Sequence, residues 1–240
     1  MPHFFINSKD IKNNTISVYD KENFNHIVKS LRTKIGEDIL FIDENQIQYE
    51  CIVLSIEKNY LTAQIKNKYP SERFLNFELC LAQSPLNSSA QSLIVEKSTE
   101  LGINHLYPIF TDNCSVKKSV IDNKIEKWQK IMFEASKQCE RAFIPTCHKL
   151  TDLKTIVNGD FDRILALVER LSKENLKNYL INNPIKQGEK ILIIIGPEGG
   201  FSKSEFELFE KNKKIQMLSL GNLILKADTA VITSIGNIVL

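Results

Sequence analysis

The strongest hydrophobic pattern in the chain is an uninterrupted apolar run, Ile-Leu-Ile-Ile-Ile, at residues 191–195. A run without polar alternation is typical of a strand that is buried on both faces, as in a parallel sheet covered by helices. The glycine-rich stretch Gly196–Gly200 follows, and after it Ser202 and Glu205 have the spacing of a helix capping box. The pattern therefore predicts a buried strand, a glycine-rich loop and a helix, in this order.

The rest of residues 71–240 alternates between apolar runs of strand length and apolar residues at helical spacing. The predicted strands are Leu79–Ala82, His105–Phe110, Ile164–Val168 and Met217–Leu220. The predicted helices are Ser88–Leu101, a long helix from Ile125 to about Arg141, Ser172–Ile181 and Asp228–Ile238. Such alternation predicts an α/β domain with a mostly parallel, doubly wound sheet. In sheets of this kind ligands bind beyond the carboxyl ends of the strands, which is where the glycine-rich loop must lie.

Residues 1–70 have a different pattern, with short strands separated by turns at the spacing of a small β-barrel. The predicted strands are Phe4–Ile6, a strand containing Ile16 and Val18, Ile39–Ile42, Tyr49–Ile56 and Leu61–Ile65, with a helix at Phe24–Leu31. The polar segment Lys66–Arg73 is predicted to be the linker between the domains. The sequence thus predicts a first domain at 1–70 and a second at 71–240.

Composition limits the class of protein without identifying it. Apolar residues make up 42% and charged residues 25%, the range of ordinary globular proteins, and the net charge of +2 does not by itself require a nucleic-acid partner. The five cysteines include no Cys-x-x-Cys pair, which indicates free thiols in a reducing cytosol. The four histidines show no metal-ligand spacing, and no apolar run reaches the roughly 20 residues that span a bilayer. We therefore expect a soluble, cytoplasmic protein without a metal or a membrane partner.

The glycine-rich loop is the first candidate for a binding site, because glycines let a backbone pass close to a ligand. It is neither a Walker loop nor a Gly-x-Gly-x-x-Gly fingerprint, and it contains no lysine to meet a triphosphate. This favours a ligand that backbone groups recognise, such as an adenine ring. An ordinary tight turn is the alternative for each loop alone, but several loops at one sheet edge favour a pocket. The predicted cofactor-binding residues are Leu167, Val168, Gly196, Pro197, Glu198, Gly199, Gly200, Leu220, Gly221, Leu223 and Leu225.

Blocks of residues along nearly the whole chain resemble those of a known family. They are Phe4-Phe5, His26 through Arg32 to Gly36, Glu96–Gly102, Ser115-Val116, Trp128, Glu134 through Arg141 to Pro145, Gly196–Phe201 and Leu220–Ala230. The sequence resembles the SPOUT-superfamily methyltransferases that modify the N3 position of a uridine in 16S ribosomal RNA. The resemblance implies a PUA-like β-barrel that binds RNA and a catalytic domain with a deep trefoil knot. It further implies S-adenosyl-L-methionine as the methyl donor, the small ribosomal subunit as the partner, and a homodimer whose interface completes the site.

The chain departs from this family at several polar positions. Lys226 stands where the family usually has arginine, and Asp228 stands where it usually has glutamate. The segment Asn87–Ala90 is neutral where the family tends to be basic, and His3 stands where a basic residue is common. These changes concern the RNA substrate and the rate of methyl transfer more than the cofactor site.

The reaction that the resemblance implies suggests roles for polar residues. Uridine N3 carries a proton, so transfer of a methyl group to it requires a base, or a cation that stabilises the developing negative charge. Arg141 and Lys226 are the candidates for the cation, and Asp228 or Glu198 for the proton acceptor. The candidates for contacts with RNA phosphates are Lys29, Arg32 and Lys34, at the end of the helix of the first domain.

Two other classes of function stay open at this point. A non-catalytic RNA-binding or ribosome-assembly factor with the same fold is supported only by the changes at Lys226 and Asp228. An NAD-dependent dehydrogenase is disfavoured, because the dinucleotide fingerprint is missing. Calorimetric binding of S-adenosylmethionine separates these two classes from each other, and methyl incorporation separates the methyltransferase from both.

Overall fold

The residues that the computed structural model describes are 3–72, 74–169, 172 and 174–240. The chain divides into two units, of which the first contains residues 1–74 and 136–143 and the second contains residues 75–135 and 144–240. The predicted boundary after residue 70 lies close to the first of these divisions. The segment 136–143, which the sequence pattern places in the second domain, groups with the first unit.

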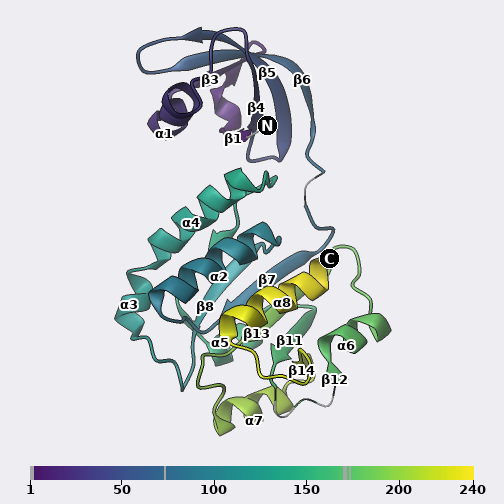
Figure 1. Ribbon diagram of the computed structural model, residues 1–240. Helices are drawn as coiled ribbons and strands as arrows, with labels where there is room; N and C mark the ends of the chain where they lie inside the picture. Colours follow the sequence, from purple (N-terminus) through teal and green to yellow (C-terminus); the bar gives the residue numbers. More distant parts are fainter. Residues whose placement is uncertain (1–2, 73, 170–171, 173) are drawn as a thin grey trace. The chain divides into compact units, whose positions relative to one another are not determined.

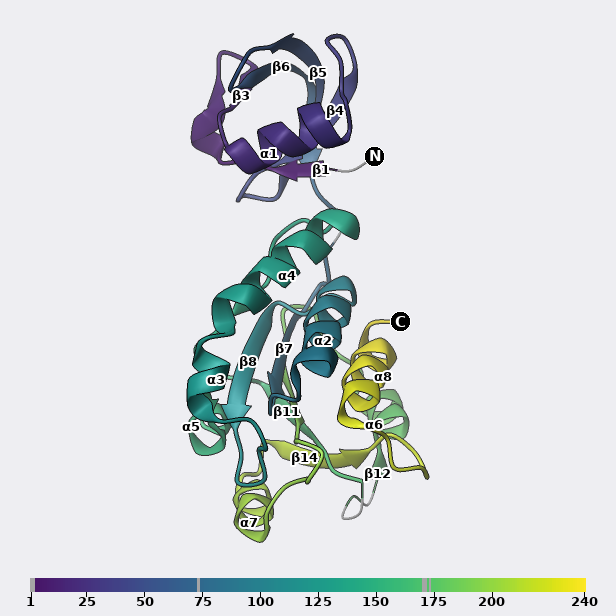
Figure 2. The ribbon, with the colours of Figure 1, turned by 60° about the vertical axis from the view of Figure 1, so that its left-hand side comes forward.

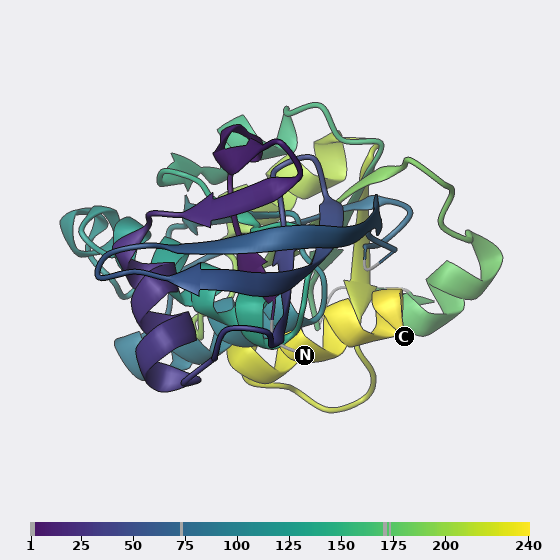
Figure 3. The ribbon, with the colours of Figure 1, turned by 90° about the horizontal axis from the view of Figure 1, so that it is seen from above.

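The first unit is a curved six-stranded sheet with a helical segment beside it (Figures 2 and 3). Its strands are β1 (His3–Phe5), β2 (Ile11–Lys12), β3 (Thr15–Val18), β4 (Asp38–Ile42), β5 (Ile47–Ile56) and β6 (Leu61–Pro70). They pair in the order β1–β4–β5–β6–β3–β2. Side chains alternate across the sheet, so Phe41, Val53 and Ala63 point into one apolar core. The short strands predicted for this part of the chain are confirmed.

The helical segment of the first unit begins before the predicted Phe24–Leu31. Asp20 caps its start, because the Asp20 carboxylate accepts a backbone N–H of the first turn. The segment consists of α1 (Lys21–Asn25) and a π-helical turn, η2 (His26–Ser30). It packs on the sheet through Phe24 and the fully buried Ile27.

The prediction of a linker at Lys66–Arg73 is wrong over its first part. Residues 66–70 continue β6, in which Lys68 lies opposite Tyr49 of β5. The long neighbouring strand supplies backbone partners to a segment whose own composition is polar, and a sequence pattern does not reveal such a partner. Arg73 lies outside the described residues.

The second unit is built on a sheet with β13 (Lys190–Ile195) at its centre (Figure 1). The strand order is β10–β8–β7–β13–β11–β14–β12, with β9 beside β8, and the pairings found among the described residues are all parallel. The other strands are β7 (Glu78–Gln83), β8 (His105–Phe110), β9 (Thr146–Cys147), β10 (Thr151–Asp152), β11 (Arg163–Leu167), β12 (Glu174–Asn175) and β14 (Ile215–Ser219). The predicted central strand and parallel sheet are confirmed.

Two apolar cores lie on opposite faces of this sheet. Along β13, Ile191, Ile193 and Ile195 belong to one core, whereas Leu192 and Ile194 belong to the other, which explains the unbroken apolar run. Helices α2, α4, α6 and α8 pack in the first core, and α5 and α7 in the second (Figure 1). The helices are α2 (Ser88–Glu100), α3 (Lys118–Asp122), α4 (Ile125–Gln138), α5 (Leu153–Val157), α6 (Leu176–Asn182), α7 (Lys203–Lys211) and α8 (Ala227–Val239).

Several predicted boundaries in the second unit need correction. The helix predicted at Ser172–Ile181 begins at Leu176, because Asn175 and the residue before it form β12 and the Asn175 side chain caps the helix. Lys173, which the prediction includes, lies outside the described residues. The last strand is Ile215–Ser219, not Met217–Leu220. The short helices α3 and α5 are absent from the prediction, since five residues are too few to show a helical period. The five cysteines have free thiols, as predicted.

Two histidines meet at the amino end of the sheet, where β7, β8 and β13 begin. His148 Nε2 lies 3.0 Å from His105 Nδ1, and His105 Nε2 lies 3.4 Å from the Glu78 carboxylate. The same carboxylate is 3.1 Å from Lys190 Nζ, and the Tyr107 ring stacks on His148 at 4.1 Å. Burial is the main reason that the pKa of each histidine is lowered, and Lys190 adds to the effect for both.

Because the pKa of both histidines is lowered, we expect the second unit to lose stability in mild acid. A histidine with a lowered pKa binds fewer protons when folded than when unfolded, so its contribution is present above the ordinary pKa of about 6.5 and is lost as pH falls below it. The free energy of unfolding should change by at most about 1.4 kcal/mol per pH unit for each ring. Denaturant unfolding at several pH values between about 5 and 7 measures it. In the double variant His105→Gln/His148→Gln, the free energy of unfolding should depend less on pH. An unchanged pH dependence would show that these two histidines are not its cause.

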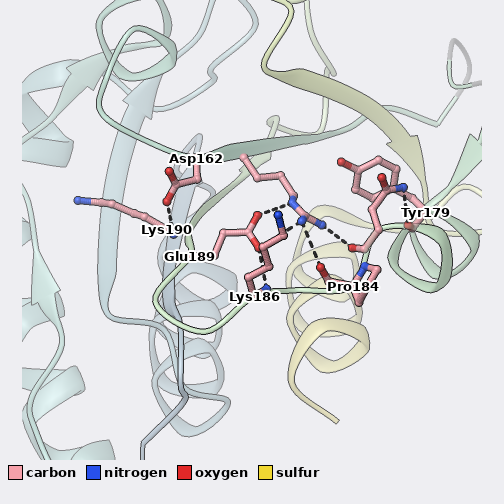
Figure 4. Close-up of polar contacts among 8 residues, drawn as sticks. Asp162, Tyr179, Pro184, Lys186, Glu189 and Lys190 are labelled. Atoms are coloured by element: carbon pink, nitrogen blue, oxygen red, sulfur yellow. Dashed lines mark hydrogen bonds and ion pairs between the residues drawn. The ribbon is translucent and has the colours of Figure 1, made fainter.

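A partly buried ion pair holds the segment that precedes β13 in place (Figure 4). Arg163 Nε lies 2.7 Å from Glu189 Oε1, and the Arg163 guanidinium also donates to the backbone carbonyl of Asn183 at 2.7 Å. Glu189 accepts the Lys186 N–H at 2.9 Å, so both charged groups have further hydrogen-bond partners. These contacts hold the loop after α6 against the start of β11.

Candidate functional site

A cavity of about 750 Å³ lies beyond the carboxyl ends of β11, β13 and β14. This is the edge at which α/β sheets bind ligands, and the volume is in the range of small-molecule and cofactor sites. Its wall consists of Leu167, Val168, Glu169, Ile195, Gly196, Pro197, Glu198, Gly199, Gly200, Phe201, Phe206, Leu218, Leu220, Ile224, Leu225, Lys226, Ala227 and Ala230. Three loops, distant in sequence, therefore meet at one site, as the sequence predicts.

The glycine-rich loop after β13 is a tight turn that the capping box of α7 follows. The Gly200 N–H donates to the Pro197 carbonyl at 2.9 Å, and Gly200 has a φ of 67° that favours glycine. A Cβ on Gly200 would meet no atom within 4 Å. A Cβ on Gly196 would lie 3.1 Å from the Phe201 ring, so that glycine is needed for packing inside the protein. Close approach of the backbone to a ligand stays a prediction for Gly200.

The second loop, after β14, is tied to the end of β11. The Leu225 N–H donates to the Glu169 carboxylate at 2.8 Å across 56 residues of sequence. Ile224 lines the cavity although its side chain is 66% exposed. Gly221 and Leu223, which the sequence predicts to bind the cofactor, are not part of the cavity wall, and Leu223 is 78% exposed.

Nine of the eleven predicted cofactor-binding residues line the cavity, and their contact with a ligand stays a prediction. Two kinds of residue in the cavity wall are absent from the prediction. Glu169 directly follows the predicted residues Leu167 and Val168 at the end of the strand, so its position in the sequence could have suggested it. Phe206 and Ala230 reach the cavity from helices α7 and α8, and their place depends on packing that a local pattern does not show.

The predicted catalytic residues occupy three different settings. Lys226 is exposed, lines the cavity and directly precedes α8, and Glu198 lines the same cavity. Asp228 lies in the first turn of α8, accepts the Thr229 N–H at 2.7 Å and is not part of the cavity wall. Arg141 belongs to the first unit, where its guanidinium lies 4.5 Å from the centre of the Phe143 ring. Burial lowers the pKa of Arg141 to about 10.

The predicted RNA contacts gather in one exposed segment of the first unit. Lys29 is in the last turn of η2, and Arg32 and Lys34 follow it with exposed side chains. Arg32 has a φ of 57°, which ends the helical segment, and the Lys34 N–H donates to the Glu37 carboxylate at 3.0 Å. Three cations on six consecutive residues fit a phosphate-binding surface, and that role stays a prediction.

The described part of the chain contains no group of three or more His, Cys, Asp or Glu side chains placed to hold a metal ion. No helix among residues 3–72, 74–169, 172 and 174–240 combines the length and the apolar character that crossing a bilayer requires.

Comparison with known proteins places the chain in a family. Residues 73–239 match the model of the RNA methyltransferase domain, and residues 19–66 match that of the RNA methyltransferase PUA domain. The ribosomal RNA small subunit methyltransferase E of Rickettsia conorii is 27% identical over 98% of this chain and 93% of its own length. The protein of the same name from Mesomycoplasma hyopneumoniae is 29% identical over 97% of this chain and 96% of its own length.

Solved structures share the whole fold. A Legionella pneumophila protein in complex with the bound cofactor SAM has a TM-score of 0.83 and 25% identity, covering 98% of this chain and 95% of that one. A ribosomal RNA small subunit methyltransferase E from Neisseria gonorrhoeae, bound to S-adenosyl methionine, has a TM-score of 0.81 and 21% identity with the same coverage. With the matched domain extending over most of its length, the chain belongs to the RNA methyltransferase family, and it also carries the RNA methyltransferase PUA domain in its N-terminal part.

Proposed function

We propose that this protein transfers a methyl group from S-adenosyl-L-methionine to N3 of a uridine in 16S ribosomal RNA of the small subunit. The observation that carries the proposal is the cavity at the carboxyl edge of the methyltransferase domain, built by three loops. The names of the relatives that match nearly the full chain support ribosomal RNA as the substrate.

The cavity residues fit the cofactor. Leu167, Leu218 and Leu220 supply apolar walls for an adenine ring, and the turn 197–200 supplies backbone groups for its polar edge. Ala230 is a small residue on the α8 side of the cavity, which leaves room for the rest of the molecule. Bound S-adenosylmethionine supplies an electrophilic methyl group on a positively charged sulfur, so the transfer is a direct displacement without a covalent enzyme intermediate.

The residues around the cavity then have three tasks. They hold the donor methyl group in line with the uridine nitrogen, which lowers the barrier by several kcal/mol. Lys226, exposed at the cavity wall, and Arg141 are the two candidates for the cation that stabilises the negative charge developing on the uracil ring. Glu198 or Asp228 accepts the N3 proton as the new N–C bond forms. Because this nitrogen is paired in a duplex, the target uridine must be unpaired or extruded.

The proposal includes a homodimer formed through the second unit, acting in the cytoplasm. Val231 and Ile235 of α8 are buried in the protein's own core, so these side chains are not available to a partner. Leu223 and Ile224, 78% and 66% exposed, are apolar side chains just before α8 that a partner subunit would cover. We expect sedimentation at micromolar concentration to give a dimer, and a monomer would contradict this part of the proposal.

We further propose that the chain after β14 takes part in a deep trefoil knot. The hydrogen bond between Leu225 and Glu169, and the shared cavity wall, support this because they bring the segment 220–226 against the loop after β11. Knots are rare in proteins. A chain pulled from both ends would extend less than an unknotted chain of equal length.

The function is tested with small ribosomal subunits that lack the modification. Incubation with S-adenosylmethionine labelled in its methyl group should place the label on one uridine, and subunits that already carry the modification are the control. If the protein binds the RNA and S-adenosylmethionine but transfers no label, it is the non-catalytic binding factor instead.

A further inference from the structure

The loop that follows β8 holds the glycine-rich loop of the cavity from outside. The side-chain amide of Asn113 donates to the backbone carbonyls of Gly199 and Gly200, both at 3.1 Å. Because both partners are carbonyl oxygens, only the NH₂ group of the amide fits there, and each of its two N–H bonds has one acceptor. A Cβ on Gly199 would lie 3.1 Å from Asn113 Cβ, so the absence of a side chain at Gly199 lets the two loops meet.

A second set of contacts joins the same two loops. The buried Glu205 carboxylate accepts the backbone N–H groups of Asp112 at 3.0 Å and of Ser202 at 2.8 Å. The Asp112 carboxylate in turn accepts the hydroxyl groups of Ser202 at 2.5 Å and Ser204 at 3.0 Å. The loop after β8 and the start of α7 are therefore fastened to each other, and Asn113 extends this connection to the glycines.

These contacts fix the orientation of two peptide planes in the cavity wall. The peptide between Gly199 and Gly200 is held at both ends, its carbonyl by Asn113 and its N–H by the Pro197 carbonyl. Asn113 also donates to the Gly200 carbonyl. This carbonyl and the Phe201 N–H belong to the same peptide plane, so the contact sets the direction of the Phe201 N–H. Gly200 and Phe201 both line the cavity. A ligand that is recognised by backbone groups binds more tightly when these groups are already ordered.

We infer that Asn113 is a positioning residue for S-adenosylmethionine, because its amide holds the glycine-rich loop in the conformation that binds the donor. The inference rests on the proposed function and deepens it. Asn113 is exposed and is not part of the cavity wall, so it acts through the loop and not by touching the ligand.

The test compares Asn113→Asp with Asn123→Asp. Asn113→Asp keeps the shape of the side chain, but it replaces the two donors with a carboxylate that faces two carbonyl oxygens. Asn123→Asp adds the same charge at an exposed position just after α3. By calorimetry, Asn113→Asp should raise the Kd for S-adenosylmethionine by about tenfold or more, since each lost hydrogen bond is worth about a factor of five. Asn123→Asp should bind like the wild type.

Kinetics and thermal unfolding distinguish positioning from a merely structural role. Asn113→Asp should raise the KM for S-adenosylmethionine, with kcat at saturating donor close to that of the wild type. The unfolding temperature of the ligand-free protein should fall by only a few degrees, as expected for the loss of two exposed hydrogen bonds. Wild-type affinity in Asn113→Asp, or equal losses in the two variants, would overturn the inference. Failure of the wild-type protein to bind S-adenosylmethionine would instead overturn the proposed function, so the two failures are distinguishable.

Discussion

Replacing Gly200 with valine is expected to abolish measurable binding of S-adenosylmethionine while the protein stays folded. Gly200 has a φ of 67°, where a β-branched residue is strained by about 1–2 kcal/mol or more. The turn would relieve this strain by changing its conformation, and it would then lose the backbone geometry that the cofactor requires. The added side chain also enters open space at the cavity wall, where it competes with the ligand. Calorimetry should show a Kd raised by roughly 10²-fold or more.

Two control variants separate strain from contact with the ligand. Gly188 has a φ of 76° with no atom within 4 Å of its Cβ position, and it is not part of the cavity wall. Gly188→Val should therefore lower the free energy of unfolding by about as much as Gly200→Val does, but it should leave cofactor binding intact. Gly200→Asn introduces a side chain that tolerates a positive φ, so it should bind better than Gly200→Val if strain dominates. Undiminished affinity in Gly200→Val would remove this loop from the binding site.

Replacing Arg141 with alanine is expected to slow methyl transfer by about 10²-fold or more while RNA binding is nearly retained. Burial lowers the pKa of Arg141 to about 10, so the guanidinium still carries its charge at pH 7. A positive charge that is already in place and shielded from water is well suited to stabilise the charge developing on the uracil ring. Arg141→Lys keeps a cation, so it should recover part of the rate, and thermal unfolding of each variant controls for lost packing against Phe143.

Arg32→Ala is the matched comparison, because Arg32 is exposed in the basic segment of the first unit. Loss of a phosphate contact should weaken RNA binding and reduce the slope of log K against log salt by about one, with kcat at saturating RNA retained. The two variants are compared by RNA binding at several salt concentrations and by single-turnover methyl transfer. If each variant loses binding and turnover in equal proportion, the proposed division between catalysis and RNA binding is wrong.

Mixing two inactive variants tests whether the subunits of the proposed dimer complete each other's sites. Gly200→Val disrupts the proposed cofactor loop, and Arg141→Ala removes one of the two candidate cations. If Arg141 acts in the site of the partner subunit, a mixed dimer has one site in which the loop and Arg141 are both intact, so activity returns on mixing. If both act within one chain, the mixture stays inactive.

Local patterns in the sequence predict those parts of the structure whose causes are local. The run at 191–195 predicts β13 because both its faces are buried, and the pair Ser202 and Glu205 predicts the start of α7 through their reciprocal hydrogen bonds. The predicted end of the helix at Leu101 is close to the end of α2 at Glu100, and Gly102, which follows, has a φ of 108° that favours glycine. Most of the cavity wall follows from the same logic, because loops at the ends of parallel strands must meet.

The features that the sequence does not predict depend on partners distant in the chain. Residues 66–70 are a strand only because β5 lies beside them. In the sequence Asn113 looks like any polar loop residue, because its partners Gly199 and Gly200 are 86 and 87 positions away. The recognition of 16S ribosomal RNA as the substrate comes from resemblance to a family, since neither the net charge nor any single motif requires it.

The position of β13 in the middle of the sheet has a consequence during protein synthesis. β7 pairs with β13, and Glu78 lies opposite Lys190. This pairing cannot form until the ribosome has synthesised and released the chain as far as β13. The strands of the first unit, in contrast, all lie within the first 70 residues and pair with one another. Contacts over such long stretches of chain slow folding and leave apolar strands exposed in the meantime. The strands of the first unit should therefore fold during translation, whereas the methyltransferase unit folds late and is the part of a nascent chain that needs protection from aggregation.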